Sequence, residues 1–450
     1  MNGLTRASTL LYPPRTHGPH HEQVDPQRAE LAHLFRRAGF GAWSAELDAA
    51  QRAGYTATVD ALLRPAAAAA PPPDLGPEPR RPGKQGDPAA KQQYRTARRA
   101  QQQAITAWWL HRMAGAEHPF PEKLTLFWHG HWATSIRKVN SARLMLAQNE
   151  TLRTHAAGDF RVLARAMVRD PALLVWLDGP RNRKTLPNEN LARELMELFT
   201  LGIGHYTEDD VREAARALTG WRVNKASGSA ALRPAQHDDR PKTVLCTTAD
   251  LDDQSLVDLL VAQAASARFV VTRLWRRFVA PADPPADAMA RLLQAYGPHR
   301  DVRALARAIL LDPVFRSTEI RNALVKQPIE YVVGVLRALR VDPAPDVSTA
   351  LRDLGQVPFA PPTVGGWPAG SAWLTTSSAQ ARLGFAQWAV ARADLTVVQH
   401  EPPAARPDAV ARLLSVDAWT PRTRTALAAA SVDTPRLVTL ALVAPEYVVS

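Results

Sequence analysis

Residues 188–221 read NENLARELMELFTLGIGHYTEDDVREAARALTGW and contain two helix patterns separated by glycines. Apolar residues recur at spacings of three and four in the first half, which predicts a helix over 188–201. Gly202 ends that helix, and Thr207 with Asp210 three residues later is typical of a capping box. This box begins a second helix that ends near residue 220. The stretch therefore predicts a helix, a glycine turn and a second helix, which indicates a mainly α-helical fold.

Sequence signals for the start and end of helices also occur outside this stretch. Asp25 suits a helix cap, Pro26 suits the first helical position, and Gly39 stands where a left-handed terminator is expected, so a helix is predicted over 26–38. Residues 222–248 differ, because Ser, Gly and Ala precede a β-branched run that favours strands. The prediction is a mainly α protein, a single irregular multi-helix body with a small β-hairpin or loop insertion around 222–248.

Composition divides the chain into four parts. Residues 1–24 are expected to form a flexible N-terminus, and 25–64 the N-terminal helices of the main body. Residues 65–90 are rich in Pro and Ala without periodicity and are interpreted as a linker or disordered loop. The main helical body is predicted over 91–450, with a Pro/Gly/Trp loop at 358–373.

The overall counts exclude several classes of protein. The 450 residues are 46% hydrophobic and 22% charged, which fits neither wholesale disorder nor a fibrous repeat. Cys246 is the single cysteine, so an intramolecular disulfide and a Cys-based zinc site are excluded. The first residues lack an apolar run of signal-peptide length, and no apolar stretch approaches the length of a membrane span. A cytoplasmic location is the default expectation.

The net charge of +12 raises the question of nucleic-acid binding. The basic residues are scattered in short pairs with acidic residues between them, whereas a nucleic-acid groove clusters them. A solvated surface is therefore favoured over nucleic-acid binding.

Two histidines, His129 and His131, stand in the run FWHGHWATS over 127–135. On a regular helix this spacing separates them by about 200°, so they can share a metal only if Gly130 breaks the helix. One core histidine and one surface histidine is the favoured alternative.

The helix predicted over 188–201 carries a second group of candidates. Glu189, Arg193 and Glu197 follow one another at spacing four, as in a surface ion-pair ladder. Glu194 lies at the edge of the apolar face, where partial burial would raise its pKa or require a partner. Asn188 is the expected cap and also a candidate substrate contact.

Two loops provide the remaining candidates. His237, Asp238 and Lys242 offer an imidazole, a carboxylate and an amine within six residues for substrate contact or metal ligation, although Asp is also common in turns. Trp367 and Trp373 could wall a pocket or stack on a sugar, and core packing is the simpler interpretation.

Lys326 and Glu330 lie four residues apart on a predicted helix. That spacing predicts an ordinary ion pair.

Five motifs in register resemble the bacterial family called domain of unknown function 1800. They are HLFRRAGFG (33–41), FWHGHWATS (127–135), the stretch 188–221, HDD with PKT (237–243) and QVPFAPPTVGGWPAG (356–370). The resemblance implies a largely α-helical protein with no accepted catalytic residues. It further implies genes commonly placed beside those of domain of unknown function 1501, a family that looks like sulfatases and alkaline phosphatases. Many relatives are exported.

Three functions remain open from the sequence. The leading hypothesis is a hydrolase that uses His/Glu acid–base or metal-assisted chemistry on a polar substrate such as a glycan. Its catalytic candidates are His129, His131, Glu189, Arg193 and Glu194, and a divalent metal would take His129, His131 and Glu194. The alternative is a non-catalytic binding or assembly partner of the domain of unknown function 1501 protein, and nucleic-acid binding ranks third.

Overall fold

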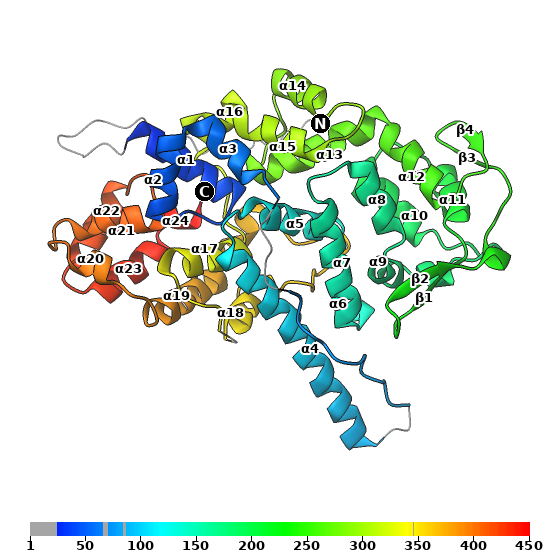
Figure 1. Ribbon diagram of the computed structural model, residues 1–450, viewed down its shortest axis with the longest axis horizontal. Helices are drawn as coiled ribbons and strands as arrows, with labels where there is room; N and C mark the ends of the chain where they lie inside the picture. Colours follow the sequence, from blue (N-terminus) through cyan, green and yellow to red (C-terminus); the bar gives the residue numbers. More distant parts are fainter. Residues whose placement is uncertain (1–24, 66–70, 84–86, 345) are drawn as a thin grey trace, which may run out of the picture.

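The computed structural model describes residues 25–65, 71–83, 87–344 and 346–450 (Figure 1). Within them the chain is mainly α-helical, as predicted, with four short strands. The N-terminus expected to be flexible, residues 1–24, lies outside the described residues.

The first half of the described chain contains these elements: α1 (Pro26–Ala38), α2 (Ser44–Ala53), α3 (Tyr55–Leu62), α4 (Pro88–Gly115), α5 (Phe120–His131), α6 (Ile136–Val139), α7 (Ala142–His155), α8 (Phe160–Val168), α9 (Pro171–Trp176), η1 (Gly179–Arg181), α10 (Asn190–Glu194), η2 (Leu195–Thr200), α11 (Glu208–Ala217), β1 (Trp221–Asn224), β2 (Ser229–Leu232), η3 (Pro234–Gln236), β3 (Lys242–Val244) and β4 (Thr247–Ala249).

The second half contains these: α12 (Asp253–Ala262), α13 (Ala264–Phe278), α14 (Ala286–Tyr296), α15 (Val302–Leu311), α16 (Pro313–Arg316), η4 (Thr318–Ile320), α17 (Pro328–Leu339), α18 (Val347–Asp353), η5 (Gly370–Trp373), α19 (Thr376–Val390), α20 (Thr396–Gln399), α21 (Arg406–Leu414), α22 (Pro421–Ala429), α23 (Thr434–Val443) and α24 (Pro445–Val448).

The helices enclose two hydrophobic cores. The first is built from residues between Leu31 and Phe315, chiefly on α1–α3 and α8–α16. The second is built chiefly from the C-terminal part of α4 and from α17–α24, with α6 and α7 beside them. Helix α5 contributes to both, since Trp128 belongs to the first core and Leu126 to the second. Opposite faces of α5 therefore look into different cores.

The β insertion is two hairpins rather than the one expected around 222–248. In the first, Trp221 pairs with Leu232, and in the second, Lys242 pairs with Ala249, both antiparallel. The intervening 3-10 turn returns the chain to the end of α11, where Arg233 N–H donates to the carbonyl of Gly220 (2.9 Å).

The helix predicted over 188–201 is present but changes its winding. Residues 190–194 are α-helical and 195–200 form a π-helical turn. The Thr200 hydroxyl donates to the carbonyl of Leu195 (2.6 Å), five residues back, as this wider turn requires.

Helix α4 is the longest element and projects from the body (Figure 1). Its buried residues all lie between Ile105 and Met113. Residues 88–104 have none, so about 25 Å of helix extends beyond the cores.

Within the described residues, no single helix is long and apolar enough to cross a membrane. Helices α12 and α13 reach that length only as a pair bent by 77°.

Candidate functional site

His129 and His131 point into different cores because α5 continues without a break through Gly130. His129 Nε2 accepts a hydrogen bond from the backbone N–H of Phe359 (3.0 Å) and packs edge-on against Trp109. His131 Nε2–H donates to the carbonyl of Phe199 (3.0 Å). Both rings are buried, so the expected surface position for one of them is wrong.

Burial also fixes the charge state of these rings. Desolvation lowers the pKa of His129 to about 3, and desolvation followed by the charge of Arg273 does the same for His131. Each imidazole is neutral near pH 7.

The metal site proposed from His129, His131 and Glu194 is not formed. No group of three or more His, Cys, Asp or Glu side chains in the described ranges is arranged to hold a metal ion. Helix geometry explains this result, because α5 is not broken at Gly130 and the side chains of His129 and His131 therefore point in different directions. The Nε2 of each histidine is also committed to the backbone of another segment.

The candidates on α10 lie at its surface. Arg193 pairs with Glu189 (3.0 Å) and makes a two-pronged contact with Glu208 of α11 (2.7 Å to each oxygen). Glu197, predicted to extend the ladder, instead accepts from the hydroxyl of Tyr206 (2.8 Å). The Asn188 side chain accepts from the N–H of Asn190 (3.2 Å), which is a capping contact.

Glu194 is half-buried on the same helix. Burial, and then the neighbouring charge of Glu197, raise its pKa above the usual value, as its position at the edge of the apolar face predicted. No hydrogen bond or ion pair joins it to His129 or His237 among the residues that the structure describes.

The candidates at 237–242 hold the hairpins to α11. Asp238 is buried between Arg240 (2.6 Å) and Arg216 (2.9 Å), whose hydrogen bonds keep the pKa of its carboxyl well below the usual range. His237 Nδ1 contacts the carbonyl of Thr219 (3.0 Å), and the fully buried Lys242 reaches Asp250 (3.4 Å). The side chains of His237, Asp238 and Lys242, which were expected to contact a substrate, therefore bind other parts of the protein.

The Pro/Gly/Trp loop 358–373 covers the end of α5. Trp367 packs against His129 with 5.5 Å between ring centroids, and Trp373 is buried. A Cβ on Gly366 would lie 2.6 Å from the carbonyl oxygen of Gly130, so the loop approaches the helix more closely than any side chain allows. Two pairs of sequence candidates are thus brought together: His129 and Trp367 by packing, and Glu189 and Arg193 by an ion pair.

A feature that the sequence interpretation missed lies on the projecting part of α4. Residues 88–104 contain four basic residues and no acidic one: Lys91, Arg95, Arg98 and Arg99. At about 100° per residue they share an arc of about 100°, and they are called here the cationic stripe. Arg95, Arg98 and Arg99 have no ion pair within the described residues, whereas about half of the described arginines of the body do, among them Arg153, Arg165, Arg216 and Arg277.

The segment 71–83 steadies this helix. Although its backbone is irregular, Gln101 donates to the carbonyls of Leu75 (2.6 Å) and Pro77 (3.1 Å), and Arg143 donates to the carbonyl of Gly76 (2.7 Å). Gln101 lies about 110° from the centre of the cationic stripe, and Arg95 and Arg99 on the stripe are exposed. The linker predicted over 65–90 is therefore held in place over its part 71–83, and α4 begins within its last residues.

The structure thus defines a mainly helical body with two small hairpins and a projecting cationic helix. The family described as "Protein of unknown function (DUF1800)" matches residues 33–449, and the chain belongs to that family. No curated protein and no solved structure matches the chain.

Proposed function

We propose that this protein works as a binding or assembly protein that holds an acidic protein partner against the cationic stripe of α4. The observation that carries the proposal is a helical segment with four like charges on one face and no buried residue. Helices in proteins gain most of their stability from packing, so a helical segment with no residue in either hydrophobic core favours a role outside the body.

The chemistry of the stripe defines the partner's surface. Arginine forks recognise carboxylates in two-pronged contacts, and like charges on one face attract a complementary acidic patch and steer its approach. Genes of the family that this chain resembles are commonly placed beside genes of domain of unknown function 1501. The protein of that second family, which looks like a sulfatase or phosphatase, is therefore the first candidate partner.

A protein partner fits the stripe better than a nucleic acid does. Proteins that grip nucleic acid typically contact about 6–10 phosphates. The stripe has four cations, and many arginines of the body are engaged by Asp or Glu.

The test is co-purification of the two proteins after coexpression. Arg95→Glu, Arg98→Glu and Arg99→Glu together are expected to abolish recovery of the partner. The matched control reverses three exposed arginines of the body, Arg52→Glu, Arg352→Glu and Arg422→Glu, with the same change in net charge. Equal recovery with both triple variants, or recovery of nucleic acid in place of protein, would rule out the proposal.

A second candidate function is acid–base hydrolysis of a polar substrate such as a glycan. It rests on Glu194, a half-buried carboxyl of raised pKa beside a second carboxyl, Glu197. General acids of hydrolases are often carboxyls whose pKa is raised in this way.

The assay is turnover of chromogenic glycosides and phosphate esters by the purified protein. Glu194→Gln is expected to remove the activity and Glu189→Gln to keep it. Turnover that survives Glu194→Gln would exclude this role for the residue.

A further inference from the structure

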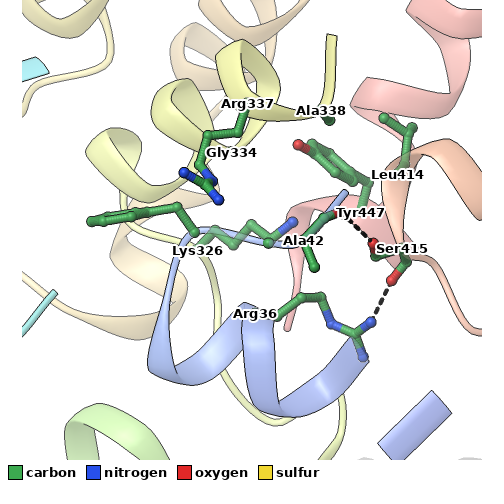
Figure 2. Close-up of a pocket in the computed structure, with 11 residues that line it drawn as sticks. Arg36, Ala42, Lys326, Gly334, Arg337, Ala338, Leu414, Ser415 and Tyr447 are labelled. Atoms are coloured by element: carbon green, nitrogen blue, oxygen red, sulfur yellow. Dashed lines mark hydrogen bonds between the residues drawn. The ribbon is translucent and has the colours of Figure 1, made fainter. Parts of the chain in front are cut away.

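A small pocket lies where the N-terminal and C-terminal parts of the chain meet (Figure 2). It is lined by α1, the turn that follows it, α17, the end of α21, and Tyr447 of α24. The C-terminal residues fix one wall, because Val325 pairs with Val449 and the N–H of Lys326 donates to the carbonyl of Val448 (3.0 Å). The cavity measures about 10 Å³, close to the space that one water-sized guest needs.

Lys326 extends its side chain into this pocket. Figure 2 shows it running into the space between α1, which carries Arg36, and α17, which carries Arg337. Lys326 is only 8% exposed, and its Nζ lies 3.6 Å from the centroid of the Tyr447 ring. The Tyr447 ring is the partner of this amine, which makes no hydrogen bond or ion pair within the described part of the chain. A buried ammonium without an anion is costly.

The expected ion pair of Lys326 with Glu330 is wrong. Glu330 is held by Lys123, by Arg277 (3.0 Å) and by the backbone N–H of Gln327 (2.8 Å). Helix α17 begins only at Pro328, so Lys326 and Glu330 are not on one helical face. The spacing of four residues therefore predicted the wrong partner.

The other cations of the pocket are already oriented by their own partners. Arg36 contacts both oxygens of Asp417 (3.1 and 3.2 Å). Arg337 donates to Glu46 (3.1 Å) and to the carbonyls of Ala114 and Ala116, but its buried Nε–H has no acceptor among the described residues. Two unsatisfied donors, Lys326 Nζ and Arg337 Nε, thus belong to residues that line one cavity.

The local charge is unbalanced. Six cations occupy this pocket and the buried cluster beside it, namely Arg36, Arg37, Lys123, Arg277, Lys326 and Arg337. Three carboxylates pair with them, those of Glu46, Glu330 and Asp417. Burial, and then the charge of Arg36, lower the pKa of Lys326 well below 10.5. A bound anion would relieve the imbalance and keep the ammonium charged.

We propose that this pocket binds one small inorganic anion of about the size of chloride, held by the Lys326 ammonium and the Arg337 guanidinium. The guest is monatomic or nearly so because the cavity admits little more than one water. It ties the α1 turn, α17 and the C-terminal helices together, so its binding stabilises the fold.

The experiment measures the melting temperature of the full chain as chloride replaces gluconate at constant ionic strength. For 450 residues, binding to one site raises Tm by about 1.4 °C for each tenfold increase in chloride above the dissociation constant. Lys326→Met is expected to lose this slope, and Lys138→Met, which changes a surface lysine, is expected to keep it. Sulfate is expected not to replace chloride because it is larger.

Two results would overturn the proposal: wild-type protein with the same Tm in chloride and gluconate, or Lys326→Met with the wild-type slope. If Lys326→Met does not fold, a bromide-soaked crystal of the wild-type protein decides the matter. An anomalous peak beside Lys326 Nζ is expected there, and its absence would contradict the site.

Discussion

Acidification is expected to destabilise the protein well above the pH at which ordinary carboxylates titrate. His33, His129 and His131 are buried, and their pKa values are lowered to about 2, 3 and 3 from 6.5, chiefly by desolvation. Because the pKa in the folded state lies below the unfolded value, the unfolded chain takes up these protons first. Stability is therefore at its full value above pH 6.5 and is lost as the pH falls from there toward 3.

The magnitude follows from the number of protons. Each such histidine contributes about 1.4 kcal/mol of lost stability per pH unit in this window. Asp170 acts in the opposite direction, because burial raises the pKa of its carboxyl to about 7 and the folded state takes up its proton first. Three histidines less one aspartate leave about 2.7 kcal/mol per pH unit, or about 4 kcal/mol between pH 6.5 and 5.

The assay is urea unfolding at pH 7, 6 and 5, with one variant that removes a single titration. His131→Gln can still donate to the carbonyl of Phe199 but has no imidazole to protonate. Its pH slope is expected to fall by about 1.4 kcal/mol per unit, whereas His205→Gln at the exposed surface keeps the wild-type slope. A free energy of unfolding that stays constant between pH 6.5 and 5 would refute the neutral, buried state of these rings.

Three substitutions test the packing that surrounds the candidate residues. Glu330→Gln leaves Lys123 and Arg277 without their shared carboxylate and is expected to lower the free energy of unfolding in urea by about 3–5 kcal/mol. A loss below about 1 kcal/mol would contradict a buried charge cluster. Gly366→Ala places a Cβ 2.6 Å from the Gly130 carbonyl at a φ of +90° and is expected to cost about 1–3 kcal/mol. Gly365→Ala, where the nearest atom is 3.6 Å away, is its control, and equal melting temperatures would disprove the close approach. Asp238→Asn is expected to speed amide exchange in the hairpins over 221–249 through loss of its arginine contacts, with the exposed Asp239→Asn as control; unchanged exchange would show that Asp238 does not hold them.

The local sequence predicted the positions of helices correctly in cases such as 26–38, but it did not always predict the backbone conformation at their ends. The helix predicted over 26–38 is found, with Asp25 as its cap. Gly39, however, is not left-handed; its φ is −145°, and a Cβ there would lie 2.7 Å from the Pro119 ring. A contact between residues 80 positions apart leaves no local pattern.

The candidate site was harder to predict because the same residue types serve chemistry and packing. His129 and Asp238 are polar residues in dense motifs, yet their partners are a distant backbone N–H and two arginines. The π-helical turn at 195–200 was also missed, because the apolar spacing fits an α-helix equally well.

Other features had a signal that was overlooked or none at all. The cationic stripe could have been found from basic residues at spacings of four, seven and eight without an intervening acid. The pocket at Lys326 had no such signal, since it joins residues near 40, 330 and 447.

The most direct test of partner binding through the cationic stripe is the dissociation constant of the purified pair, measured against salt. Binding by wild-type protein is expected to weaken as salt rises, because the contact joins opposite charges. The triple variant Arg95→Glu, Arg98→Glu and Arg99→Glu is expected to bind at least about tenfold more weakly in low salt, a loss of about 1.4 kcal/mol. The same affinity and salt dependence in that variant as in wild-type protein would contradict the stripe as the binding face.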